Sequence, residues 1–273
     1  MAKKAKSETA PVEVATPKPP AFETLKIVVP SHRRWDLLTT HKAVDIDAVC
    51  IPESQLAQYR AHNPQLEYVT HPDSVVGLHA KRDWIYKHFG SVFMFDDDVK
   101  AVHRSWLGQV KTHSGTLKPH EVRLVVNNLF EMAVDAGIYL FGLSPQATPM
   151  AYSPMKPFKM SGTVMGASYG VRAGSKLHWN PQMVSKEDLW ISMLNAYHYR
   201  FLLIDNRYFC STHEVYTRPG GLSGQRTQAN EVADYEILTR TFGDCLIRRE
   251  GKKNRFGGDS IKSTASMAWQ PLW

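Results

Sequence analysis

Three consecutive aspartates, Asp96, Asp97 and Asp98, carry the clearest chemical signal in the sequence, because they directly follow the apolar run 92–95. Adjacent carboxylates repel one another, so placing them at the end of a buried strand is costly unless a cation compensates their charge. Mg²⁺ and Mn²⁺ suit this position, since both prefer oxygen ligands and are commonly held by one or two carboxylates together with substrate phosphates. We therefore expect a divalent-metal site here. The simpler alternative is an acidic turn that caps the next segment.

The elements that must position these carboxylates alternate between short apolar runs and helical patterns. Continuously apolar, β-branched runs predict buried strands at residues 25–30, 48–52, 66–70 and 91–95. Helical patterns lie between them at residues 53–61 and 78–89. This alternation predicts an α/β fold with a mostly parallel central sheet and helices on both faces. In such sheets ligands bind beyond the carboxyl ends of the strands, where the aspartates would lie.

The second half of the chain is less regular. Helical patterns occur at residues 119–136, 187–199 and 230–242, and strand patterns at 139–143 and 201–210. Residues 151–171 are rich in Met, Gly, Ser and Thr, which indicates strands or loops near a site. Residues 214–228 contain three glycines and two arginines, a composition typical of a lid or a disordered loop.

Composition indicates one globular domain, because 43% of the 273 residues are hydrophobic and no interior linker divides them. We expect a flexible tail at residues 1–20, the domain at 21–245 and a basic extension at 246–273. The net charge of +7 lies mainly at the two ends, which carry +2 and +4 and leave +1 for the domain. No apolar run approaches the roughly 20 residues that span a membrane. Three scattered cysteines and the lack of a secretory signal predict reduced thiols and a cytoplasmic location.

The order of these features resembles that of nucleotide-sugar glycosyltransferases with the GT-A fold. The residues that carry the resemblance are Pro30-Ser31 with Arg33 and Arg34, the helix with Gly77 and Lys81-Arg82, and the Asp96-Asp97-Asp98 motif. The resemblance implies that Asp96 and Asp98 hold Mn²⁺ or Mg²⁺ against the donor diphosphate, with Asp97 as a helper. It also places the base and ribose of a donor, taken here as a UDP-sugar, on Pro30, Ser31 and Arg33.

Two later features fit the same family. Glu187 and Asp188 open a helical segment and match the acidic pair that supplies the catalytic base in inverting GT-A enzymes. We assign the base to Asp188, with Glu187 as the alternate. Acids at a helix start are also favoured by the helix dipole, and without this base a retaining mechanism stays open. His213, after the last strand, is a candidate third metal ligand, although a lone histidine is often structural.

Basic residues supply candidates for the donor diphosphate. Lys81 and Arg82 could neutralise it or could be surface charges on a helix. Arg218 and Arg226, in the glycine-rich segment, are candidates for a lid that closes over the leaving diphosphate. The glycines Gly162, Gly166 and Gly170 could let the backbone approach the sugar or the acceptor, or could serve packing.

Within this fold family, the chain is most similar to phage-associated glycosyltransferases that modify 5-hydroxymethylpyrimidines in DNA. The resemblance implies transfer of a hexose or pentose to 5-hydroxymethylcytosine in double-stranded DNA, in the cytoplasm of an infected bacterium. The base would be reached in the major groove or flipped out. Candidate groove or stacking residues are Trp106, Trp179, Trp190, His103 and Arg104.

Three alternatives remain. A glycosyltransferase acting on protein or polysaccharide would carry the same signature. A metal-dependent nuclease or phosphotransferase would also use carboxylates at a strand end, but further acidic strand ends are missing. A non-catalytic nucleic-acid-binding module would bind without metal, yet the sequence has no recognised binding motif.

Overall fold

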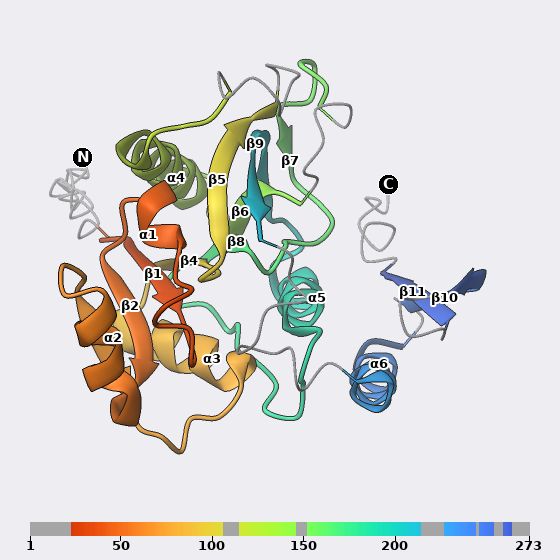
Figure 1. Cartoon of the computed structure of the whole chain (residues 1–273). Coiled ribbons are helices and arrows are strands. Elements are labelled where there is room, and N and C mark those ends of the chain that lie inside the picture. Colours follow the sequence, from red (N-terminus) through yellow and green to blue (C-terminus); the bar gives the residue numbers. More distant parts are fainter. Residues whose placement is uncertain are drawn as a thin grey trace, which may run out of the picture.

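The computed structural model describes residues 23–105, 115–145, 152–213, 227–243, 246–253 and 259–263, the last two ranges without their side chains. In this part of the chain a nine-stranded sheet forms the centre of the protein, with helices packed around it (Figure 1). None of the described helices is long and apolar enough to cross a membrane. The expected tail at residues 1–20 lies outside the described residues.

The first half of the sheet is parallel. Its order is β3 (Tyr68–His71), β2 (Ala48–Pro52), β1 (Lys26–Pro30) and β4 (Val92–Phe95). Each strand pairs in parallel with its neighbour, so all four carboxyl ends lie at one edge. This confirms the βαβ units expected from the alternation of apolar runs and helices.

The second half mixes directions. β8 (Ser168–Val171) runs antiparallel to β4 and to β6 (Leu140–Ser144), and β6 pairs in parallel with β9 (Leu203–Thr212). β5 (Val99–Arg104) and the short β7 (Phe158–Lys159) both run antiparallel to β9. Strands β1, β2, β3, β4, β6 and β9 therefore run one way, and the sheet is mostly parallel, as expected.

Helices cover both faces of the sheet. Ile27 and Val29 of β1 face a core built with α1 (Thr40–Ala43), α2 (Leu56–His62) and α4 (Pro119–Asp135). Val28, between them, faces the core built with α3 (Leu78–Phe89) and α5 (Glu187–Tyr199). This alternation explains why the strands read as continuously apolar runs.

Two elements extend the chain beyond this body. Helix α6 (Gln228–Phe242) packs on α5 through Tyr235 and Leu238. Strands β10 (Leu246–Lys253) and β11 (Asp259–Ser263) form a separate antiparallel pair beside α6 (Figure 1). The sequence predicted α6 as a helix at residues 230–242, but gave residues 246–273 only as a basic extension.

Most element predictions are confirmed to within three residues, but α1 and β5 were not predicted, and neither was the strand pair β10–β11. Helix α1 has only four residues, too short for a periodic signal. Strand β5 follows the aspartates with no apolar run, because only Val99 and Val102 of its six residues are buried. A short 3₁₀ turn, Glu53–Gln55, also precedes α2, where the sequence predicted continuous helix.

Gly170 provides a test of the packing. A methyl group at this position would lie 2.4 Å from Cζ of Phe141, inside the core, so Gly170 serves packing and does not approach a substrate. We expect Gly170→Ala to lower the free energy of unfolding by about 2 kcal/mol, because overpacking forces neighbouring side chains aside. Urea unfolding followed by circular dichroism measures this.

The control for this test is Gly166→Ala. Its methyl group would meet no atom closer than 3.5 Å, so its unfolding midpoint should stay near that of the wild type. Equal midpoints for Gly170→Ala and the wild type would contradict the packing.

Candidate active site

The three aspartates lie between β4 and β5, at the carboxyl edge of the parallel strands. Helix α1 and the residue before it fix their backbone: the Thr39 amide donates to the carbonyl of Asp97 at 3.1 Å, and Thr40 Oγ1 donates to the carbonyl of Asp96 at 2.5 Å. The same Thr40 oxygen accepts the Val99 amide at 3.1 Å. The unpredicted helix α1 therefore holds the acidic turn in place.

Asp97 is committed to contacts within the protein. Its carboxylate is buried and accepts hydrogen bonds from Ser31 Oγ at 2.6 Å and from Arg34 Nη1 at 2.7 Å. Ser31 Oγ also contacts the Tyr59 hydroxyl at 2.7 Å, and Lys81 Nζ donates to the Ser31 carbonyl. Asp97 thus ties the end of β1 to the end of β4.

Asp98 Oδ2 lies 3.6 Å from the same nitrogen, Nη1 of Arg34, and the residue is only 5% exposed. Burial raises the pKa of its carboxyl to about 7, and the charges of Asp96 and Asp97 add to this, while Arg34 opposes it. The His213 amide donates to the Asp98 carbonyl at 3.0 Å, because β9 pairs with β5 and places Thr212 opposite Val99. The backbones of Asp98 and His213 therefore lie side by side, while the role of His213 as a metal ligand stays a prediction.

Asp96 faces a different arginine. Arg82 Nη2 donates to Asp96 Oδ1 at 2.7 Å and to the carbonyl of Gly166 at 2.7 Å. Arg82 is completely buried, with its guanidinium 4.8 Å from the centre of the Tyr169 ring. The Asp96 side chain keeps 32% exposure, so it can face a ligand and Arg82 at the same time.

The second acidic pair lies next to the same arginine. The Gly166 amide donates to Asp188 Oδ2 at 3.3 Å, and the Leu189 amide donates to Asp188 Oδ1 at 2.8 Å. A methyl group at Gly166 would lie 3.5 Å from Glu187 Oε1 and 3.8 Å from both Arg82 Nη2 and Asp188 Oδ2. Asp96, Arg82, Glu187 and Asp188 therefore form one cluster around Gly166, although far apart in sequence.

The two acids differ in environment. Glu187 is 5% exposed and its Oε2 has no hydrogen-bond partner, whereas Asp188 is half-buried. Burial raises the pKa of Glu187 to about 7, and the neighbouring Asp188 charge adds to this while Arg82 opposes it. Asp188 is thus the better placed of the two for contact with an acceptor.

The carboxylates of Asp96 and Asp98 are chemically suited to bind a divalent cation. Carboxylate oxygens such as those of Asp96 and Asp98 are the ligands that Mg²⁺ and Mn²⁺ prefer, and burial with the neighbouring charges of Asp96 and Asp97 raises the pKa of Asp98. Among the described residues no three His, Cys, Asp or Glu side chains converge as a complete metal site. This arrangement fits a cation held by one or two carboxylates together with a diphosphate.

Other residues expected at the site occupy different positions. Lys81 and Arg82 are buried, so neither is a surface charge on its helix. Arg33 is exposed and has a positive φ of 53°, and it is the neighbouring Arg34 that binds the aspartates. Arg218 and Arg226 lie outside the described residues.

The expected groove residues are corrected in part. Trp179 and Trp190 are 3% and 5% exposed, and their indole N–H groups donate hydrogen bonds inside the protein. Because they are buried, they do not stack on DNA bases. His103 stacks on Phe209, and Arg104 pairs with Glu121. Trp106 lies outside the described residues.

Sequence reasoning missed Arg34, Tyr59 and Thr40 as parts of the site. Arg34 was within reach, because it belongs to the same motif as Arg33. Tyr59 and Thr40 gave no sequence signal of a site, since Tyr59 is a single polar group in a predicted helix and Thr40 belongs to no predicted element.

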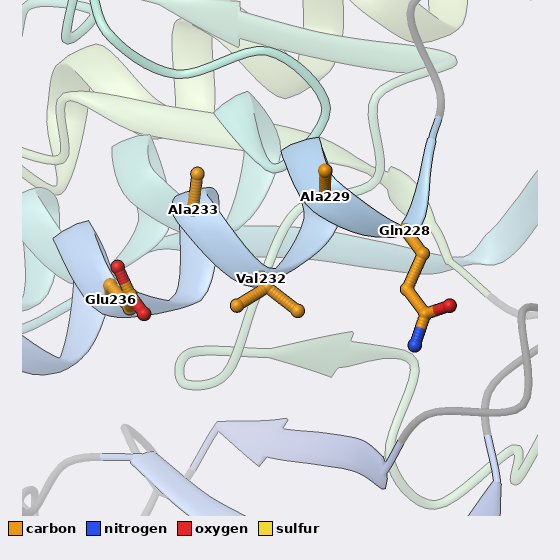
Figure 2. Close-up of a pocket in the computed structure, with 5 residues that line it drawn as sticks. All are labelled: Gln228, Ala229, Val232, Ala233 and Glu236. Carbon is orange, nitrogen blue, oxygen red and sulfur yellow. The ribbon is translucent and has the colours of Figure 1, made fainter.

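A shallow groove of about 630 Å³ lies elsewhere, along α6. Its lining consists of Gln228, Ala229, Val232, Ala233 and Glu236. Figure 2 shows Gln228 and Val232 pointing to one side of the helix and the two alanines to another. No residue of the acidic cluster lines this groove, and Glu236 is the one carboxylate in its lining. The candidate active site is therefore the acidic cluster at the edge of the sheet.

The model of the TET-associated glycosyltransferase family matches residues 25–220, which include the whole acidic cluster. The chain belongs to this family. It is therefore a glycosyltransferase, and its α/β architecture is the one expected for the GT-A class. No curated protein sequence matches the chain.

Two solved structures show distant similarity. The crystal structure of S. aureus TarS 1–349 is 9% identical, with a TM-score of 0.41, over 68% of this chain and 60% of that one. A CMP:2-keto-3-deoxy-manno-octonic acid synthetase complexed with CTP is 8% identical, with a TM-score of 0.39, over 78% of this chain and 98% of that one. The chain thus spans less than two thirds of the TarS structure. The family assignment rests on the match to residues 25–220.

We expect Asp97→Asn to destabilise the glycosyltransferase by about 3 kcal/mol, because it leaves the buried Arg34 without its closest ion-pair partner. Urea unfolding measures the change. Asp45→Asn is the control, since Asp45 pairs with Arg123 at the surface and such pairs contribute less than about 1 kcal/mol. Equal effects of the two substitutions would contradict the buried role of Asp97.

Glu187 should make stability depend on pH. Its raised pKa means that the folded state binds a proton more tightly than the unfolded state, whose Glu titrates near 4.5. The contribution of Glu187 to the free energy of unfolding therefore falls as pH rises from about 4.5 to 7. Between pH 4.5 and 7, the free energy of unfolding of the wild type should fall by about 1 to 3 kcal/mol more than that of Glu187→Gln. Parallel pH profiles from urea unfolding would contradict this.

Proposed function

We propose that the protein transfers a sugar from a UDP-linked donor to the hydroxyl of 5-hydroxymethylcytosine in double-stranded DNA, with inversion and with Mn²⁺ or Mg²⁺. The observation that carries the proposal is the pair of carboxylate centres on either side of Arg82. One consists of Asp96 and Asp98 at the end of β4, and the other is Asp188 at the start of α5.

The two centres suit the two halves of an inverting transfer. Asp188 is half-buried and its carboxylate accepts hydrogen bonds from the backbone amides of Gly166 and Leu189, so it can also take the proton of an acceptor hydroxyl. The acceptor oxygen then forms a bond to the anomeric carbon. The bond from that carbon to the phosphate oxygen breaks, and its electron pair leaves with the nucleoside diphosphate.

Asp96 and Asp98 would hold the metal ion, which when bound supplies positive charge to the leaving diphosphate. The chain itself supports this with a rigid backbone, since α1 fixes the turn through Thr39 and Thr40. Pro30 and Ser31, at the end of β1, are buried beside the same turn, so Arg33 is the exposed member of the set predicted for the nucleoside part of the donor. The backbone of His213 lies next to Asp98, which supports His213 as a proposed further ligand.

Two observations support DNA as the acceptor. The TET association of the family supports a modified DNA base. The excess of positive charge at the two ends of the chain suits a polyanion, because neutralised phosphates release counterions.

The decisive assay offers UDP- and GDP-sugars with Mn²⁺ and duplex DNA containing cytosine, 5-hydroxymethylcytosine or 5-hydroxymethyluracil, followed by mass spectrometry of the nucleosides. We expect a hexose or pentose mass on 5-hydroxymethylcytosine alone. Metal-dependent hydrolysis of the donor without transfer to DNA would contradict the acceptor, and cleaved DNA would contradict the whole proposal.

Two variants separate the centres. Asp98→Ala should abolish metal-dependent donor binding, measured by calorimetry with UDP and Mn²⁺. Asp188→Asn should leave that binding unchanged and lower kcat by 10²- to 10⁴-fold, roughly the contribution of a general base. Wild-type turnover in both variants would contradict the assignment of both centres.

A further inference from the structure

We propose that Arg82 is a positioning residue that fixes the separation between the donor-side and acceptor-side carboxylates, and that it does not bind the donor diphosphate. This inference rests on the proposed function, because it takes Asp96 as part of the donor side and Asp188 as part of the acceptor side.

Burial argues against a diphosphate contact. The Arg82 side chain has no exposed surface, and its Nη2 already donates to Asp96 Oδ1 and to the Gly166 carbonyl, both at 2.7 Å. A substrate phosphate would have to displace Asp96 to reach this nitrogen. Asp96, by contrast, keeps about a third of its side-chain surface exposed, so the ligand-facing member of the pair is the carboxylate.

The contacts of Arg82 join the two centres through a short chain of bonds. From Asp96 the chain passes through Arg82 Nη2 to the carbonyl of Gly166, and the amide of the same glycine donates to Asp188 Oδ2 at 3.3 Å. A second connection runs between the strands, where the Asp96 amide donates to the Ala167 carbonyl at 3.2 Å. The two sides are therefore linked by backbone and by one side chain.

The Arg82 side chain is held in place by its buried neighbours. Its guanidinium lies 4.8 Å from the centre of the buried Tyr169 ring, and the Tyr169 hydroxyl accepts a hydrogen bond from Trp179 Nε1 at 3.1 Å. Glu187, also buried, attracts Arg82 from α5. Both hydrogen bonds of the guanidinium come from Nη2, while the buried Nε and Nη1 have no hydrogen-bond partner. A planar guanidinium can keep these bonds while it stacks on the ring, whereas a lysine ammonium is a compact point charge on a flexible stem.

The position of Arg82 should affect how efficiently donor cleavage leads to sugar transfer. If Arg82 sets the separation, its loss leaves donor binding and hydrolysis to water largely intact but misplaces the acceptor-side base. A displacement of about 1 Å can cost roughly 10²-fold in rate. The ratio of sugar transfer to donor hydrolysis therefore reports on Arg82 in a way that a purely structural role does not.

The test compares Arg82→Lys with Arg172→Lys. Arg172 is a matched control, because it also lies over a tyrosine ring, that of Tyr139 at 5.2 Å, and pairs with a carboxylate, Glu23, at 3.0 Å. It follows the end of β8 that pairs with the start of β4, at the opposite edge of the sheet. Both variants keep the positive charge and lose the planar fork.

Transfer and hydrolysis are measured with the donor and hydroxymethylated duplex that the wild type uses, and UDP–Mn²⁺ binding is measured by calorimetry. For Arg82→Lys we expect the transfer-to-hydrolysis ratio to fall by about 10²-fold with UDP affinity within threefold of the wild type, and Arg172→Lys to keep the ratio. An unchanged ratio, or a parallel loss of UDP binding and both reactions, would overturn the proposal.

Amide hydrogen exchange tests Arg82 even if the wild type proves to transfer no sugar, an outcome that counts against the proposed function alone. We expect faster exchange at residues 164–168 and 187–190 in Arg82→Lys, with both segments unchanged in Arg172→Lys. Wild-type exchange rates at both segments in Arg82→Lys would overturn the positioning role.

Discussion

The charge of three adjacent carboxylates at the end of a buried strand is the constraint around which this site is built. The structure meets it by giving each aspartate a different environment. Asp97 is neutralised inside the protein by Arg34, and Asp96 is paired with Arg82. Asp98 lies farther from Arg34 than Asp97 does, and burial together with the charges of Asp96 and Asp97 raises the pKa of its carboxyl. The motif thus divides into one acid that is committed to contacts within the protein, Asp97, and two that differ in exposure, since Asp96 keeps 32% of its side-chain surface and Asp98 is buried.

This division could not be read from the sequence, although the motif itself could. The apolar run before the aspartates and the βα alternation predicted the fold and the edge at which the site lies. The partners of each carboxylate depend on long-range contacts, such as the 63-residue separation between Arg34 and Asp97. Local patterns do not encode such contacts. The sequence therefore suggested Arg33 as a donor-binding residue but did not reveal that Arg34 forms the ion pair with Asp97. Short elements failed for a related reason, since the four residues of α1 show no period.

Burial was the second property that sequence patterns described poorly. Trp179, Trp190 and Arg82 were all assigned to ligand contact because of their chemical type. Each is enclosed by the packing of α3, α5 and β8, where both indoles and Nη2 of Arg82 donate hydrogen bonds. Residue type indicates what a side chain can do, whereas the tertiary structure decides what it can reach. Glu187 and Asp188 show this most clearly, because adjacent positions on one helix differ in access to solvent.

The reversed direction of β8 has a further consequence. Because β8 runs antiparallel to β4, the loop that enters it arrives at the same edge as the carboxyl ends of the parallel strands. The parallel half and this incoming loop meet at the site but belong to separate stretches of chain, residues 26–98 and 152–167. Hydrogen bonds join them through Arg82, Asp96 and Ala167, and Val164 of the loop packs in the core below. Under the proposed function, changes at the exposed positions of the loop would alter the acceptor side while β1 and β4 keep the donor side in place, which gives the fold a modular route to new acceptors.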